Sequence, residues 1–262
     1  MIPYPKIDPE IVRIGPLAVR WYGMMYLLGF ASSYLLVRLQ IRRKGLKVPV
    51  DFESSLYSYL IAGLLIGARL GYVIFYDLSV YIRKPLEVFA VWHGGMSFHG
   101  GLVGALVAGI LFCRKAGVDF WQTADLVIVT APIGLGLGRL GNFINGELFG
   151  RVSNVPWAMV FPEGGPLPRH PSQLYEFLLE GVLLFIILWK AKDRGLSSGV
   201  LTSLFIILYG LFRFSVEFFR QPDPQVGFVI GFLTMGQILS ACMMLAGVAL
   251  YYLRRKRRVA SK

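Results

Sequence analysis

Charged residues are scarce in this chain of 262 residues, and cysteine and histidine are scarcer still. Only 16% of the residues are charged, whereas 55% are hydrophobic, and the mean hydropathy is +0.60. Because a soluble globular domain carries about a quarter charged residues, this composition excludes that class and indicates a polytopic membrane protein.

The usual motifs for metals and nucleotides are also missing. No C-x-x-C pair, H-E-x-x-H or P-loop occurs, and the two cysteines, Cys113 and Cys242, both lie in apolar segments. We predict that these cysteines are small packing residues and that the protein uses no metal and no cofactor. Gly136, Gly138 and Gly141 spell G-x-G-x-x-G, but inside an apolar run without a preceding strand, so close helix packing explains them better.

Long apolar runs dominate what the sequence does contain. A helix crosses about 30 Å of hydrocarbon with about 20 residues, and the runs are continuous rather than alternating, so strands of a membrane barrel are not expected. The sequence predicts an all-α polytopic membrane protein, in a single integral-membrane domain over 1–262, with seven transmembrane helices. These are placed at Leu17–Val37, Leu56–Tyr76, Ser97–Cys113, Ala124–Leu140, Ser172–Trp189, Gly199–Phe219 and Val229–Leu253.

The basic residues predict the orientation of these helices. Sixteen lysines and arginines lie in the loops 38–47, 114–115, 190–194 and 254–262, whereas the alternate loops contain eight. Since cytoplasmic loops carry the excess, we expect an external N-terminus, a cytoplasmic C-terminus and an external segment over 141–171. The net charge of +12 then reflects topology and anionic lipid headgroups rather than nucleic acid. No cleavable signal peptide is evident, so the first span is expected to target the chain.

A polar cluster ends the fourth predicted span. In the stretch 139–150, Arg139, Asn142 and Asn145 are spaced three apart, so one helical face would present all of them. Hydrocarbon cannot solvate a guanidinium or an amide, and such groups survive there only against a partner, a cavity or a ligand. Polar contacts between helices are one explanation. A pocket for an anionic ligand is the other, and we favour it because two further spans show similar clusters.

The first of these further clusters surrounds His99. It stands among glycines in Ser97-Phe98-His99-Gly100-Gly101, at the external end of the third predicted span. A structural histidine in a glycine-rich turn would fit this sequence. Histidine is also the residue type that titrates near neutrality, and its small neighbours would leave the ring accessible, so His99 is a candidate to accept a proton.

The second further cluster ends the sixth predicted span. Tyr209, Arg213 and Glu217 recur at intervals of four, so they share one helical face. The arginine and glutamate could simply neutralise each other in lipid, or the pair could hold a guanidinium in place for a phosphate or carbonyl.

Three further charged residues, Arg69, Glu176 and Glu180, lie in predicted spans. Arg69 is expected to pair with Asp125 or with a glutamate, whereas the spacing of Glu176 and Glu180 suggests no partner for either.

Several sequence blocks, in order along nearly the whole chain, resemble one known family. The chain is similar to the prolipoprotein diacylglyceryl transferases, which are bacterial inner-membrane enzymes. The blocks that carry this resemblance are 20–23, 97–101, 139–151, 169–176 and 217–223. The resemblance implies transfer of an sn-1,2-diacylglyceryl group from phosphatidylglycerol to the lipobox cysteine of a prolipoprotein, with release of glycerol 1-phosphate.

This activity agrees with the residue types. The nucleophile is the thiol of the substrate, so the enzyme needs no cysteine of its own, and His99 is the candidate base. Arg139 and Arg213 suit the negative charge that grows on the leaving phosphate. The resemblance implies that Arg139 and Asn142 bind the phosphatidylglycerol headgroup. It also implies that Glu147 and Gly150 shape the site and that Glu217 and Tyr209 orient Arg213. Tyr22, Asn145 and Arg220 are expected to contribute less.

Two other functions compete with the transferase. A transporter for an anionic solute would use the same arginines, but the sequence shows no internal repeat and the polar groups gather toward one leaflet. A non-catalytic protein that binds an anionic lipid would need the arginines but not His99.

Overall fold

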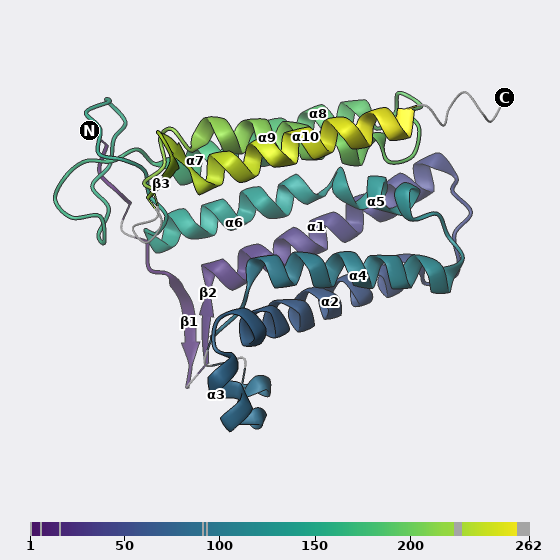
Figure 1. Ribbon diagram of the computed structural model, residues 1–262, viewed down its shortest axis with the longest axis horizontal. Coiled ribbons are helices and arrows are strands. Elements are labelled where there is room, and N and C mark those ends of the chain that lie inside the picture. Colours follow the sequence, from purple (N-terminus) through teal and green to yellow (C-terminus); the bar gives the residue numbers. More distant parts are fainter. Residues whose placement is uncertain are drawn as a thin grey trace. The chain divides into compact units, whose positions relative to one another are not determined.

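The computed structural model describes residues 2–5, 7–15, 17–90, 92, 94–222 and 227–255. Over these residues the regular secondary structure is helical apart from two short hairpins, and a long irregular segment covers residues 146–171 (Figure 1). Asp223, the last residue of the fifth resembling block, and the basic tail 256–262 lie outside the described residues. The chain divides into two compact units, one formed by Val37–Ala124 and the other by Met1–Leu36 with Asp125–Lys262.

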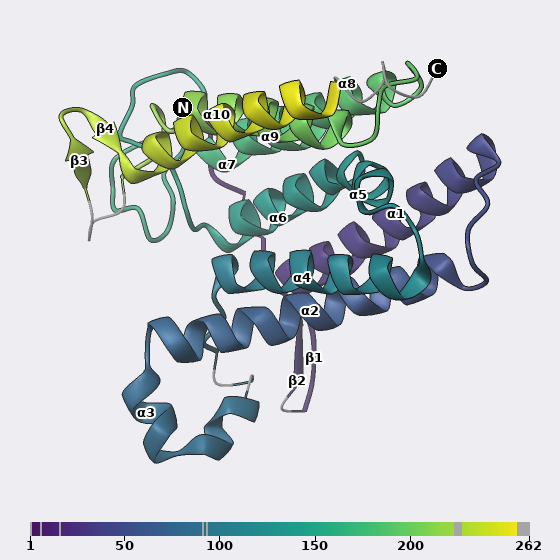
Figure 2. The ribbon, with the colours of Figure 1, turned by 45° about the vertical axis from the view of Figure 1, so that its right-hand side comes forward.

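In the unit Val37–Ala124, two long helices pack closely through glycines. Helix α2 (Phe52–Phe75) lies along α4 (Phe98–Ala116), and both are apolar enough to cross a membrane (Figure 2). A Cβ atom at Gly67, Gly100 or Gly104 would overlap backbone atoms of the facing helix. The glycines of this region therefore serve helix packing, since only they permit such a close approach. Between the two helices the chain forms α3 (Leu78–Arg83) and the 3₁₀ helix η1 (Pro85–Phe89).

Arg69 holds the segment that leads to α4. This side chain is 5% exposed, and its guanidinium donates hydrogen bonds to backbone carbonyl oxygens that the segment after α3 supplies. The acceptors, at 2.5–3.3 Å, belong to Glu87, Val88, Ala90, Gly94 and Gly95. The expected pairing of Arg69 with Asp125 or a glutamate is therefore wrong.

Asp125 instead binds backbone donors at the N-terminus of a later helix. Its carboxylate accepts hydrogen bonds from the backbone N–H of Gly199 at 2.7 Å and from the N–H and hydroxyl of Thr202. These contacts satisfy donors at the first turn of α9 (Val200–Val216), which has no intrahelical acceptor for them.

The second unit begins with a hairpin of β1 (Glu10–Ile14) and β2 (Leu17–Arg20), which leads directly into α1 (Trp21–Lys44). The predicted first span therefore starts too early, because its first four residues form a strand. Helices α5 (Phe120–Ile128) and α6 (Ala131–Asn145) follow one another with a bend of 41°. The fourth predicted span thus corresponds to a bent pair of helices rather than to one straight helix.

After the irregular segment 146–171, this unit continues with helices and one hairpin. Helix α7 (Ser172–Glu176), the π-helical turn η3 (Phe177–Leu183) and α8 (Leu184–Ala191) form one continuous helical stretch. After α9, strands β3 (Phe228–Ile230) and β4 (Leu233–Thr234) precede α10 (Met235–Arg255). The seventh predicted span therefore also begins too early, since Val229 lies in β3.

The helices of this unit share an apolar core. Val129, Leu184, Leu188 and Leu201 are buried together, which joins the end of α5 to α8 and α9. Gly136 of α6 faces Gly181 of η3 so closely that an added Cβ would approach the opposite Cα to 3.0 Å. Helices α9 and α10 lie side by side (Figures 1 and 2). These contacts bring α6, α7, η3 and α9 together, and these elements carry the charged residues of the candidate site.

Four of the described helices are long and apolar enough to cross a membrane, namely α1, α2, α4 and α10, and the bent pair α5–α6 makes a fifth. The remaining predicted spans fall on α7–η3–α8 and on the 17-residue α9. A multi-pass membrane protein is thus supported, whereas the number seven and the orientation stay predictions. The free cysteines differ from expectation in one respect: Cys113 is buried in α4, but Cys242 is exposed on α10 and is not a packing residue.

Candidate functional site

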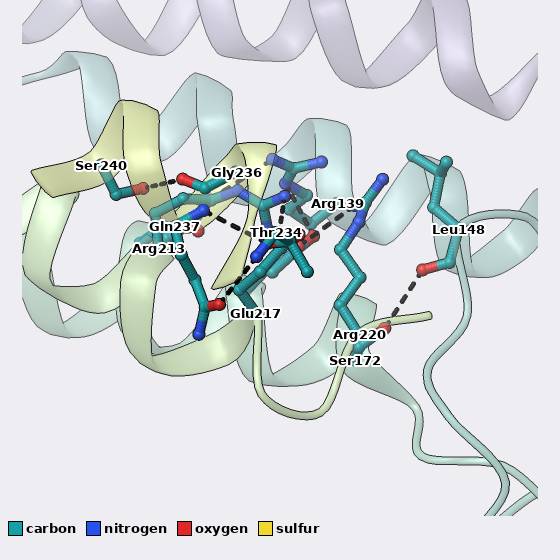
Figure 3. A network of polar contacts seen from close by, with 12 residues as sticks. Arg139, Leu148, Ser172, Arg213, Glu217, Arg220, Thr234, Gly236, Gln237 and Ser240 are labelled. Carbon is teal, nitrogen blue, oxygen red and sulfur yellow. Dashed lines mark hydrogen bonds and ion pairs between the residues drawn. The ribbon is translucent and has the colours of Figure 1, made fainter. Parts of the chain in front are cut away.

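Glu176, the last residue of α7, connects three arginines. Its Oε2 lies 3.0 Å from Nε of Arg139, and its Oε1 lies 2.7 Å from Nη1 of Arg213 and 3.4 Å from Nη1 of Arg220. Figure 3 shows these three arginine side chains in one network of polar contacts. One carboxylate thus holds guanidiniums from α6, from α9 and from the segment after α9 at a single place.

A second carboxylate fixes Arg213. Glu217 Oε2 lies 2.7 Å from Nη2 of Arg213, so the ion pair predicted from the spacing of four residues is present. The other oxygen, Oε1, accepts a hydrogen bond of 3.0 Å from the hydroxyl of Thr234 (Figure 3). Gly236 permits this contact, because a Cβ there would lie 2.7 Å from Glu217 Oε1.

Thr234 is itself held by the start of α10. Its hydroxyl accepts a hydrogen bond from the backbone N–H of Gln237, and the side-chain Oε1 of Gln237 accepts one from the backbone N–H of Thr234. This reciprocal pair is a capping box, which satisfies two backbone donors at a helix start. The orientation of Arg213 therefore depends on α10 as well as on α9.

The charged groups of this network differ in accessibility according to their sign. The side chains of Glu176 and Glu180 are fully buried, and that of Glu217 is 6% exposed. The guanidiniums lie nearer to the surface, with 19%, 16% and 12% of the side chains of Arg139, Arg213 and Arg220 exposed. A layer of buried carboxylates thus supports a partly accessible layer of guanidiniums, which is the arrangement that an anion-binding site needs.

Glu180 lies in the π-helical turn η3. Its Oε2 is 3.5 Å from Nη2 of Arg139, and Tyr209 lies near both Arg139 and Glu180, with which it interacts electrostatically. Neither carboxylate oxygen of Glu180 has a hydrogen bond among the described residues. Single π-helical turns are frequent at functional sites.

The two asparagines of α6 converge on a different residue. Both side-chain amides donate to Oε1 of Glu147, from Asn142 at 2.8 Å and from Asn145 at 3.2 Å. The backbone carbonyl of Glu147 accepts a hydrogen bond of 2.6 Å from the amide of Gln173 on α7. The predicted set of Arg139 and the asparagines therefore belongs to two neighbouring networks, one around Glu176 and one around Glu147.

Tyr22 lies against α6 near this second network. Its ring fills the space beside Gly141, where a Cβ would approach the ring to 2.8 Å, and its hydroxyl is 3.1 Å from that of Tyr26. Tyr26 interacts electrostatically with Arg139 and with Glu147. The two tyrosines of α1 thus connect the two networks.

Gly150 permits a close backbone contact that positions Arg220. The backbone N–H of Gly150 donates to the carbonyl of His170, and Gly150 pairs with Arg220 in an isolated antiparallel bridge. A Cβ at Gly150 would lie 2.5 Å from the carbonyl oxygen of Phe219 and 2.7 Å from Cβ of His170. Arg151 adds a hydrogen bond of 2.9 Å to the carbonyl of Arg220.

His170 belongs to a chain of aromatic side chains in the segment between α6 and α7. Trp157 donates to the hydroxyl of Tyr175 at 2.7 Å, and this hydroxyl lies 2.9 Å from Nδ1 of His170. Since the hydroxyl accepts from the indole, its own hydrogen is available for Nδ1, which favours the neutral imidazole. Partial burial also lowers the pKa of His170 from its ordinary value.

His99 lies in the unit Val37–Ala124, whereas the arginine network lies in the other unit. It is exposed in the first turn of α4, one residue after Phe98. The Ser97 side chain caps this helix by accepting a hydrogen bond from the backbone N–H of Gly100 at 3.2 Å. The imidazole is therefore accessible, as its small neighbours suggested.

Sequence reasoning missed the residues that organise this site. Glu176 and Glu180 are visible as two carboxylates in one apolar span, which is a signal for buried ion pairs, but the sequence does not show their partners. Thr234 and Gln237 have the spacing of a capping box, which is readable before α10. Among the described residues no group of three histidines, cysteines or carboxylates could hold a metal ion.

The fold and the site define a multi-pass helical membrane protein with a cluster of arginines suited to an anionic ligand. Comparison with protein families gives a more specific result, since the family model of the prolipoprotein diacylglyceryl transferases matches residues 9–253. The chain belongs to this family.

Full-length relatives support the assignment. Each is named phosphatidylglycerol–prolipoprotein diacylglyceryl transferase. The relative from Coxiella burnetii is 54% identical over 94% of this chain and 95% of its own. The relative from Desulfotalea psychrophila is 53% identical over 95% of this chain and 94% of its own. The relative from Geobacter sulfurreducens is 52% identical over 98% of both chains.

Proposed function

We propose that this protein transfers the sn-1,2-diacylglyceryl group of phosphatidylglycerol to the lipobox cysteine of prolipoproteins, the first step of lipoprotein maturation. The observation that carries the proposal is the layer of guanidiniums held over buried carboxylates, because the donor lipid and the leaving group are both phosphate esters. The names of its full-length relatives point to the same two substrates.

In the proposed reaction the cysteine sulfur attacks the diacylglyceryl carbon that carries the phosphate. The carbon–oxygen bond breaks, its electron pair stays on the phosphate oxygen, and glycerol 1-phosphate leaves. The thiol must lose its proton to become the attacking thiolate, and His99 is the proposed base. No cofactor takes part in this substitution.

Arg139 and Arg213 would stabilise the charge that grows on the departing phosphate. Their mutual support through Glu176 fixes them before the substrate arrives, so little reorganisation is needed in the transition state. Arg220 joins the same carboxylate, Glu217 holds Arg213 in place, and Tyr209 interacts electrostatically with both Arg139 and Arg213.

The second network would bind the glycerol end of the headgroup. Amides and hydroxyls suit a neutral polyol, and the amides of Asn142 and Asn145 are gathered at Glu147, just after the helix that carries Arg139. Tyr22 would close this side of the site through its contact with Gly141. Gly150 would shape it by bringing the backbone against Arg220.

The orientation is also part of the proposal. We infer seven spans with an external N-terminus and a cytoplasmic C-terminus, in the bacterial inner membrane, from the excess of basic residues in one set of loops. A reporter that works only in the cytoplasm, fused after Lys262, should be active. Activity of a periplasm-specific reporter at that position would contradict the seven-span arrangement.

Reaction of the purified protein with phosphatidylglycerol and a lipobox peptide tests the transferase. The peptide should gain the mass of one diacylglyceryl group on its thiol, and a peptide with serine in place of this cysteine should gain nothing. Lipid binding without a mass gain would support a non-catalytic lipid-binding protein instead. Solute flux into liposomes without a mass gain would support a transporter.

A further inference from the structure

The arginine network brings together equal numbers of guanidiniums and carboxylates. Three guanidiniums, those of Arg139, Arg213 and Arg220, face three carboxylates, those of Glu176, Glu180 and Glu217. A phosphodiester carries one negative charge, so its arrival leaves the group of charges with one negative charge in excess. Such an excess is unfavourable away from water unless another charge changes at the same time.

Glu180 is the carboxylate whose charge is least supported. It is fully buried, and the one ion pair that it forms within the described part of the chain is the 3.5 Å contact with Arg139, which is longer than the 3.0 Å contact between Arg139 and Glu176. Neither of its oxygens has a hydrogen bond among the described residues. The other charged or titratable groups that face it are Glu176 on α7 and Tyr209 and Arg213 on α9.

An anionic ligand at Arg139 weakens this support further. The guanidinium that turns its donors toward a phosphate shares its charge between ligand and carboxylates, and the longest contact is the easiest to give up. Glu180 would then be a buried carboxylate beside a second carboxylate, Glu176, and the cation that remains nearby, Arg213, is already ion-paired with Glu176 and Glu217. A carboxylate in these surroundings binds a proton instead of remaining charged.

We propose that the phosphate of the donor lipid binds together with one proton, and that Glu180 is the residue that takes it. The identity of the lipid rests on the proposed function. The proton keeps the network neutral while the arginines hold the phosphate, and it leaves Glu176 charged to position Arg139 and Arg213. Glu180 thus acts through the charge balance of the site rather than by contact with the reacting atoms.

Linkage gives this proposal a measurable consequence. Binding that takes up one proton weakens about tenfold for each unit of pH, over the range in which Glu180 is charged without ligand and protonated with it. Phosphatidylglycerol itself keeps one negative charge throughout the neutral range, because a phosphodiester does not titrate there. The pH dependence must therefore come from the protein.

Calorimetric titration of the purified protein with phosphatidylglycerol in detergent micelles tests the proposal. In two buffers of different ionisation enthalpy at the same pH, the measured heats should differ by the amount expected for uptake of up to one proton per lipid. Binding with equal heats across the pH range 5.5 to 9 would overturn proton uptake. The transfer assay with the lipobox peptide is independent, so it shows separately whether the proposed function fails.

Two variants and a spectroscopic measurement assign the proton. Glu180→Gln should bind phosphatidylglycerol with buffer-independent heats and a flat pH profile, whereas His99→Gln should keep the uptake of the native protein. Uptake that persists in Glu180→Gln would overturn the assignment to Glu180. If that variant does not fold, the infrared difference spectrum of the native protein with isotope-labelled glutamate decides, because lipid binding must produce a protonated-carboxyl band that shifts with the label, whereas the ester bands of the lipid do not shift.

Discussion

Arg69 and Arg139 are both arginines in apolar helices, but their partners differ in kind. The donors of Arg69 bind five neutral backbone carbonyls, and the side chain is almost completely buried. Arg139 faces two carboxylates and remains 19% exposed. When backbone carbonyls accept hydrogen bonds from all the donors of an arginine, its role is structural. Buried carboxylates instead hold an arginine in place while one side of its guanidinium stays accessible. An intramembrane arginine therefore indicates a functional site only when its partners are known.

The largest expected effect comes from removing the accessible guanidinium. We expect Arg139→Ala to lower the rate of diacylglyceryl transfer by about 10³-fold or more, and Arg139→Lys to restore little of it. Lysine keeps the charge but loses the planar fork that binds phosphate oxygens in pairs. Rates of peptide modification measure both variants. An Arg139→Lys enzyme with full activity would reduce this arginine to a point charge.

The next effect separates His99 from Arg213 by its pH dependence. Loss of a general base costs about 10²- to 10⁴-fold. Because the free thiol ionises near pH ~8.5, the deficit of His99→Gln should shrink as pH rises from about 7 to 9. The deficit of Arg213→Ala should stay constant, since leaving-group charge needs stabilisation at every pH. Parallel profiles of transfer rate against pH would leave His99 as a structural residue.

Arg69 should affect stability rather than chemistry. Arg69→Met leaves several buried carbonyls without a donor, and we expect a loss of about 2 to 4 kcal/mol in the free energy of unfolding. Thermal denaturation in detergent measures this loss. The surviving folded enzyme should show the native pH profile of transfer. A changed profile with unchanged stability would mean that Arg69 belongs with the functional arginines.

The smallest effect concerns His170. Burial lowers its pKa below the unfolded value, so the unfolded chain binds more protons as pH falls, and the stability of the folded state decreases below about pH 6.5. This contribution is fully present above that pH. His170→Gln should remove part of the acid destabilisation, measured as the change in melting temperature between pH 7 and pH 5.5. An identical change in both proteins would exclude His170 as its source.

Much of the architecture was predictable because apolar runs are local signals. The runs located the long helices, but Leu17 and Val229 lie in hairpin strands, and α1 continues to Lys44, beyond the predicted end at Val37. Strand pairing outside a membrane depends on contacts between neighbours, and hydropathy does not report it. The bend between α5 and α6 was not predicted either, since its two helices share one apolar run.

The site was only half predictable for a related reason. The spacing of four residues predicts the Arg213–Glu217 pair correctly, because both partners lie on one helix. The contacts of Glu176 join residues 37 and 44 positions apart in sequence, and no local pattern contains them. The partner of Arg69 was predicted wrongly because a buried charge was expected to pair with an opposite charge. Backbone carbonyl groups of a nearby loop accept its hydrogen bonds instead.

The placement of Glu176 also bears on how the chain enters the membrane. Helix α9 carries Arg213, and Glu217 directly follows its last residue, so this segment can neutralise its own charge. Helix α6 carries Arg139 and depends on Glu176 and Glu180 from the next helical stretch. A solitary arginine is costly in hydrocarbon. We therefore expect α6 to leave the translocation machinery together with α7–η3–α8, as a helical hairpin, while α9 can insert alone. The charges of the site would thus determine the order in which the helices enter the membrane.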